Sequence, residues 1–152
     1  MIFEHADGAP ILVLDAEQSW GLIEPGRFGR LVVVAGQRAD VFPINYAAAP
    51  DRTLIFRTAP GTKLAKLAIN AEVLFEADQV STDTAWTVTV RGQAHWLQTS
   101  SEIEAAEELQ LRPWVPTLKD NYVRVTPAEI TGRHFQLSPD PARDFGEAPA
   151  TG

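Results

Sequence analysis

The chain has 152 residues, of which 45% are hydrophobic and 22% charged, with a formal net charge of −7 and no cysteine. This length suffices for one domain with its own core, and the lack of cysteine excludes disulfides, thiolate nucleophiles and cysteine-ligated metals. The acidic balance argues against nucleic acid or an anionic membrane as the main partner, because both require a basic surface. No apolar run approaches ~18 residues and no secretory leader is present, so we expect a cytoplasmic protein without a membrane partner.

A short helix is predicted near the N-terminus. Asp15, followed three residues later by Gln18, resembles a capping box, which marks a helix start. Pro25 and Gly26 end this helix.

A hairpin follows the first helix. A β-branched run at Leu31–Val34 and an extended segment at Val41–Ala47 flank a turn at Gly36–Asp40. Pro43 lies inside the second arm and cannot donate a hydrogen bond to a neighbouring strand. We therefore expect the arm to lie at an edge or a bulge there.

The middle of the chain predicts a strand, a helix and another strand. The segment Thr53–Thr58 is a strand that ends before Pro60. A helix is expected from Thr62 to about Asn70, and Glu72–Asp78 forms the next strand.

A period-two pattern is clearest near residue 86. Trp86 points to one side of the predicted strand while Thr87 points to the other, and the strand continues to Leu97. Gly92 within it predicts a bend or a bulge.

The last predicted elements are a helix and a strand. Ser101 and Glu104 have capping-box spacing at the start of a helix that Pro113 ends. A sixth strand runs near Tyr122–Thr126 and resumes near residue 130.

These elements fit a mainly β fold in one domain, residues 1–136. Six strands and three short helices of this size predict a small antiparallel barrel with helices at its rims. Residues 137–152 are rich in proline, alanine and glycine without apolar periodicity, so we expect a flexible tail.

The segment from Arg52 to Lys66 carries four of the 13 basic residues and no acidic residue. Thr58, Thr62 and Lys63 lie at its predicted strand-to-helix turn. Backbone N–H groups at a helix start, hydroxyls and cations together suit a phosphate group. The alternative is that Arg57 and Lys63 are ordinary solvated charges, and spacing alone leaves both interpretations open.

Other reactive groups give little signal. His5, His95 and His134 lack metal-ligand spacing, and no nucleophile motif or catalytic acid–base pair stands out. We therefore predict no metal site and name no catalytic residue. Trp114, between two prolines, is a candidate for lining a ligand cavity or a dimer seam.

Five segments in this order resemble one family: GRLVVVAGQRADVFPINY, TLIFRTAPGTKLAKL, EVLFEAD, AWTVTVRGQAHWL and RVTPAEITGRHF. They resemble the FMN-binding split-barrel proteins of the pyridoxamine 5′-phosphate oxidase-like superfamily, closest to the nitroimidazole-resistance-type flavoproteins. The resemblance spans about residues 11–135 and implies a six-stranded antiparallel split β-barrel.

The resemblance also implies a homodimer with two flavin sites at the subunit interface. Arg57, Thr58, Thr62 and Lys63 would hold the FMN phosphate, which agrees with the charge argument. The remaining cofactor-binding residues that the resemblance implies are Pro43, Ile44, Asn45 and Tyr46 beside the flavin ring, Thr87 at its polar edge, and Trp86 stacked nearby.

The chain departs from true pyridoxamine phosphate oxidases in one respect. Its C-terminal strand offers only Arg133 and His134 in place of a basic motif, which argues against pyridoxamine phosphate as substrate.

The leading hypothesis is therefore an FMN-dependent oxidoreductase that passes electrons from a reduced nicotinamide to a small organic acceptor. The alternatives are a flavin-binding module without turnover, a relative that uses a deazaflavin, and an empty barrel acting as a scaffold. A haem relative is disfavoured because His95 and His134 have no axial-ligand context.

Overall fold

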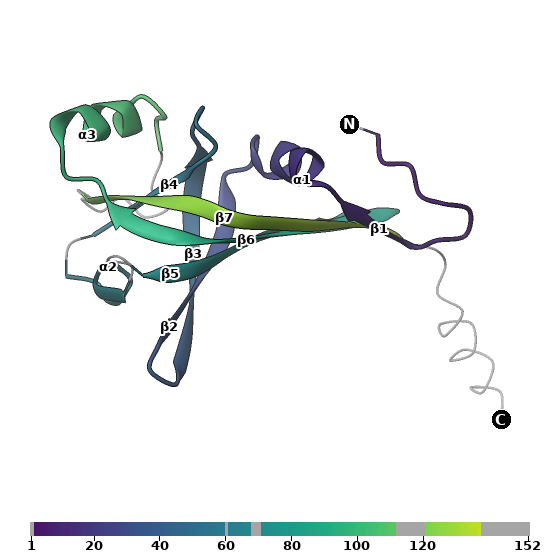
Figure 1. Ribbon diagram of the computed structural model, residues 1–152, viewed down its shortest axis with the longest axis horizontal. Helices are drawn as coiled ribbons and strands as arrows, with labels where there is room; N and C mark the ends of the chain where they lie inside the picture. Colours follow the sequence, from purple (N-terminus) through teal and green to yellow (C-terminus); the bar gives the residue numbers. More distant parts are fainter. Residues whose placement is uncertain (1, 60, 68–70, 112–120, 138–152) are drawn as a thin grey trace.

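The computed structural model describes residues 2–59, 61–67, 71–111 and 121–137. This part of the chain forms seven strands and three short helices (Figure 1). In chain order they are β1 (Ile11–Leu14), α1 (Ala16–Ile23), β2 (Phe28–Ala35), β3 (Arg38–Ala48), β4 (Leu54–Thr58), α2 (Lys63–Leu67), β5 (Glu72–Val80), β6 (Thr84–Trp96), α3 (Ser100–Glu107) and β7 (Asn121–Gln136).

Six of the strands close into a ring. The order around it is β7, β4, β3, β2, β5 and β6, and β6 pairs again with β7. Every pairing is antiparallel. The predicted six-stranded antiparallel barrel is therefore confirmed. The seventh strand, β1, was not expected; it lies outside the ring and pairs with the C-terminal end of β7.

The predicted hairpin is present as β2 and β3. Gly36 at its tip has a φ of +63°, a left-handed conformation that glycine adopts readily and tight hairpin turns often require. Pro43 lies opposite Arg30 of β2, whereas β4 pairs only with Tyr46–Ala48. In the described ladders, β3 has an open edge at Pro43, which confirms the predicted edge position.

β6 and β7 are long strands that belong both to the barrel and to a sheet extending beyond it (Figure 1). The register of this pair shifts between Arg91 and Gly92, which confirms the irregularity predicted at the glycine. A Cβ atom on Gly92 would clash with the backbone carbonyl oxygen of Thr126. The two strands therefore approach closely only because residue 92 has no side chain.

α1 begins as predicted. Asp15 accepts a 2.8 Å hydrogen bond from the Gln18 backbone N–H, while the Gln18 side chain accepts one from the Asp15 backbone. α2 starts at Lys63, next to the expected Thr62, and the expected end at Asn70 lies outside the described residues.

The prediction of the α3 capping box was wrong in its position. Thr99 and Glu102 form it, two residues before the expected Ser101 and Glu104. Both pairs fit the same spacing rule, and the earlier start brings Ile103 against the barrel wall, which a local motif does not reveal.

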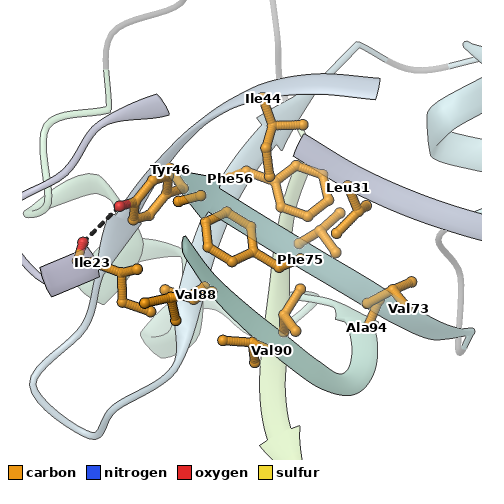
Figure 2. Packing of buried hydrophobic residues seen from close by; sticks show 14 of the residues in the cluster. Ile23, Leu31, Ile44, Tyr46, Phe56, Val73, Phe75, Val88, Val90 and Ala94 are labelled. Carbon is orange, nitrogen blue, oxygen red and sulfur yellow. Dashed lines mark hydrogen bonds between the residues drawn. The ribbon is translucent and has the colours of Figure 1, made fainter. Parts of the chain in front are cut away.

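The main core fills the barrel. Figure 2 shows side chains from all sides of the ring meeting there, with Phe75 and Phe56 fully buried at its centre. Ile23 of α1 closes the core from one side. A smaller cluster, centred on Ile55 and Tyr122, lies on the outer barrel wall beneath α3.

Candidate functional site

The turn between β4 and α2 gathers two hydroxyl groups, as predicted for a phosphate site. Thr58, the last residue of β4, is 3% exposed, and its Oγ1 lies 3.1 Å from Thr62 Oγ1. The Thr62 hydroxyl donates to the Ala59 carbonyl at 2.9 Å and accepts from the Ala65 backbone N–H at 3.2 Å. Thr58 is therefore the donor to Thr62. A phosphate bound here would accept a hydrogen bond from one of these hydroxyl groups in place of its present acceptor.

Lys63 follows Thr62 in the chain and forms an ion pair with Asp40 of β3. The Lys63 Nζ to Asp40 Oδ1 distance is 2.9 Å, and the Lys63 side chain is 50% exposed. The hydrogen bond from Lys63 lowers the pKa of Asp40. Sequence reasoning missed Asp40, because only strand pairing brings the hairpin tip near α2.

Arg57 does not join the two hydroxyl groups. Arg57 and Thr58 are successive residues of β4, so their side chains leave the strand on opposite faces. The Arg57 guanidinium lies 5.2 Å from the ring centre of Tyr122 on the outer wall. A phosphate bound by both residues would have to lie at the end of the strand, where the two faces meet.

The predicted ring-binding segment of β3 alternates between the core and the outer wall. Ile44 is 5% and Tyr46 1% exposed, and both pack in the main core. Pro43 and Asn45 point outward. Ile44 and Tyr46 therefore have only backbone groups to offer a ligand on the outer wall, which is the role the resemblance implies for this strand.

Trp86 and Thr87 lie on opposite faces of β6. Trp86 packs against the main core, whereas Thr87 lies opposite Asp78 on the outer wall. Thr87 pairs with Arg133 of β7, whereas Arg57 pairs with Tyr122, which lies 11 residues earlier on the same strand, roughly 36 Å along it at about 3.3 Å per residue. Within one subunit, the structure does not bring Thr87 to the turn that holds Thr58, Thr62 and Lys63.

A charged cluster that sequence reasoning missed lies beside Thr87. Arg30 of β2 contacts Glu76 at 2.7 Å and Asp78 at 2.9 Å, both on β5. Burial and the neighbouring Asp78 carboxylate raise the pKa of Glu76, although Arg30 opposes the rise. The alternation of β2 and β5 places these residues on the outer wall, but their proximity follows only from strand register.

One face of the sheet carries most of the exposed apolar side chains. Directly paired residues share a face of a sheet, and the pairs Val13–Arg133, Arg133–Thr87, Thr87–Asp78 and Arg30–Glu76 define this one. We call it the open face. Among the described helices, α1 and α2 pack against the main core on the opposite side of the sheet, and α3 covers the part of the outer wall around Ile55 and Tyr122. The exposed apolar residues of the open face are Ile11, Val13, Phe28, Val34, Val41 and Val80.

The remaining predictions concern Trp114 and the C-terminal tail, metal binding and membrane spanning. Trp114 and residues 138–152 lie outside the described residues. The described segments hold no group of three or more His, Cys, Asp or Glu side chains placed for a metal. Among the described helices, none has the length and hydropathy needed to cross a membrane.

Comparison with known proteins places the chain in a family. Residues 15–134 match the model of the family described as pyridoxamine 5′-phosphate oxidase. An uncharacterised protein of Mycobacterium tuberculosis is 47% identical over 92 residues, covering 60% of this chain and 84% of that protein.

Solved structures agree with this match. The FAD-binding protein from Mycobacterium smegmatis is 40% identical with a TM-score of 0.75, covering 84% of this chain and all of that one. A protein from Corynebacterium glutamicum described as a pyridoxamine 5′-phosphate oxidase is also 40% identical, with a TM-score of 0.79 over 87% of this chain and 98% of that one.

A nitroimidazole-resistance-type protein from Bacteroides thetaiotaomicron shares the fold, with a TM-score of 0.67 at 13% identity, over 90% of this chain and 98% of that one. The family model covers well over half of the chain, and two solved structures with 40% identity share its barrel. The chain therefore belongs to the pyridoxamine 5′-phosphate oxidase family of split-barrel proteins.

Proposed function

We propose that this protein binds FMN and acts as an oxidoreductase that passes electrons from a reduced nicotinamide to a small organic acceptor. The observation that carries the proposal is the β4–α2 turn of a chain in this family. Thr58 and Thr62 present paired hydroxyls there, and Lys63, the next residue, carries a half-exposed cationic side chain. The two hydroxyl groups and the ammonium group are hydrogen-bond donors, and the phosphate of FMN offers only hydrogen-bond acceptors.

The residues of the turn fit the phosphate of the cofactor. Lys63, Thr58 and Thr62 would hold it, and Arg57 would approach from the outer wall. Backbone groups of β3 from Pro43 to Tyr46 would run beside the flavin ring. Bound FMN would supply the redox chemistry, while the protein binds the cofactor, orients it and limits access of water. No described residue of this turn carries a carboxylate or an imidazole, and Asp40 of β3, which contacts Lys63, is held in that ion pair.

We further propose a homodimer with two flavin sites at the subunit interface. The open face supports this, because six exposed apolar side chains on one face of a sheet are unusual for a monomer. The separation of Thr87 from the turn also supports it. If Thr87 contacts the flavin held at Lys63, it has to come from the second subunit.

The identity of the flavin needs a direct test. The Mycobacterium smegmatis relative is named for FAD, so FAD is the alternative flavin, and a deazaflavin is a further one. The protein should be purified, its visible spectrum recorded, and any released cofactor identified by chromatography and mass spectrometry. We expect a flavin spectrum and FMN on denaturation.

A second measurement separates an enzyme from a binding module. Flavin-loaded protein should be mixed anaerobically with NADH and NADPH, and then with an organic acceptor such as a quinone. Bleaching of the flavin followed by rapid reoxidation supports the oxidoreductase. Flavin that neither nicotinamide reduces would leave a binding module as the function. A colourless protein that also takes up no added flavin would contradict both.

A further inference from the structure

The proposed phosphate site needs the cation of Lys63, which is paired with Asp40 in this structure. Lys63 Nζ lies 2.9 Å from Asp40 Oδ1, and this oxygen is also 3.6 Å from Nε of Arg38. The Asp40 side chain is 18% exposed, against 50% for Lys63 and 76% for Arg38. One carboxylate thus lies between two cations from different elements, α2 and the tip of the β2–β3 hairpin.

Asp40 and a phosphate group require the same donor. Both are anionic acceptors, and both bind an ammonium group through charge-assisted hydrogen bonds. An ion pair this exposed contributes little to folding, because water screens it and two flexible side chains are ordered to form it. The pair is therefore easily exchanged for another anion, and Arg38 is near enough to Asp40 to accept the displaced carboxylate.

We infer that Asp40 is an internal competitor for the flavin phosphate: it holds Lys63 in the unliganded protein and passes to Arg38 when the phosphate binds. This inference rests on the proposed function, because it concerns the same phosphate. It makes Asp40 a residue that sets the affinity for phosphorylated flavins, although it donates nothing to the ligand. Removing its charge strengthens binding of FMN.

The test is the variant Asp40→Asn, which keeps the shape of the side chain and removes its charge. Cofactor-free protein is titrated with FMN and with riboflavin, and binding is followed by flavin fluorescence. We expect FMN to bind roughly three- to tenfold more tightly, because a weak competing ion pair and a nearby negative charge are removed. Riboflavin lacks the phosphate, so its affinity stays the same.

Arg38→Gln tests the exchange itself. In the wild-type background it should weaken FMN binding, because the displaced carboxylate loses its second partner. In the Asp40→Asn background the same change should have a smaller effect, and this coupling distinguishes exchange from a general effect of charge. Asp83→Asn is the matched control, since Asp83 lies beyond the far end of β5 from α2 and the change in net charge is the same.

Three results would overturn the inference. Weaker FMN binding by Asp40→Asn would mean that Asp40 positions Lys63 for the phosphate. Equal changes for FMN and riboflavin would indicate an effect unrelated to the phosphate. Unchanged FMN affinity in both Asp40→Asn and Asp40→Ser, with normal melting curves, would show that Asp40 does not compete with the phosphate for Lys63. Wild-type protein that binds neither flavin would instead contradict the proposed function.

Discussion

The Tyr46 hydroxyl donates a 2.6 Å hydrogen bond to the backbone carbonyl of Ile23, which fastens the end of α1 to strand β3 (Figure 2). The same carbonyl accepts the backbone N–H of Gly26 at 3.0 Å. Burial raises the pKa of Tyr46 to about 12, so the hydroxyl remains a donor at any physiological pH. Gly26 lies so close to this hydroxyl that a Cβ atom there would clash with it.

This contact predicts coupled effects of two substitutions. Tyr46→Phe should lower the free energy of unfolding by about 1 kcal/mol, because one buried hydrogen bond is lost while Ile23 keeps its bond from Gly26. Gly26→Ala should cost about 1–3 kcal/mol by overpacking. In the Tyr46→Phe background Gly26→Ala should cost less, since the clashing oxygen is gone. Urea unfolding of the four proteins tests this, and strict additivity would contradict it.

The N-terminal segment predicts a pH-dependent stability. His5 Nδ1 donates to the Ala9 carbonyl at 3.0 Å, so its Nε2 accepts from His134 Nδ1 at 2.8 Å. Burial, and secondarily the charge of His5, lowers the pKa of His134 below its unfolded value. The unfolded chain therefore binds more protons than the folded one below about pH 6.5.

Stability should then be full above about pH 6.5 and fall as the pH decreases from there towards the lower folded pKa of His134, by at most about 1.4 kcal/mol per pH unit. His134→Asn keeps a donor near the position of Nδ1 but does not titrate. It should reduce the slope, measured by urea unfolding between about pH 5 and about pH 7.5. His95→Asn on β6 is the control. An equal slope in wild type and His134→Asn would assign the dependence to other groups.

We expect the substitution Lys63→Ala to lower the affinity for the cofactor. Removing a charge-assisted hydrogen bond to the phosphate should weaken FMN by about 1.5–3 kcal/mol, roughly ten- to hundredfold. Lys66→Ala changes the charge of the same helix equally and should have a much smaller effect. The measurement is a fluorescence titration with FMN. Similar losses in both variants would indicate a general electrostatic effect and place the phosphate elsewhere.

We expect the substitution Val41→Glu to change the oligomeric state. Val41 is 60% exposed on the open face, so a charge there should oppose burial against a second subunit. We expect the variant to shift from dimer to monomer in sedimentation velocity. Ala105→Glu, an exposed change on α3 away from the open face, should leave the dimer intact. A wild-type monomer, or a dimer unaffected by Val41→Glu, would contradict the proposed interface.

Local patterns were sufficient for most of the barrel. The alternation at Trp86 and Thr87, the glycine at 92 and the proline at 43 each reported on a strand or on its irregularity, and the structure agrees. β1 gave no such signal. It has only four residues, Ile11–Leu14, and exists because β7 offers a partner more than a hundred residues later in the chain.

The candidate site was predictable to a smaller extent. Composition and order pointed to the turn with Thr58, Thr62 and Lys63, whose closeness is local. The ion pair of Lys63 with Asp40 depends on the register of the barrel, which local patterns do not encode. For Trp86 the sequence pattern was sufficient, because period-two alternation already places this residue on the face opposite Thr87. A shared role for Trp86 and Thr87 on one face of the strand conflicts with that alternation.

The closure of the ring through β7 has a consequence for biosynthesis. β4 is made early, yet its second partner is residues 121–125, near the end of the described chain. Until β7 leaves the ribosome, β4 and much of β6 each keep an unpaired edge, and such edges invite pairing with other chains. The barrel therefore closes only after β7 has been made, and a chain truncated before Asn121 would expose the edges that aggregation uses.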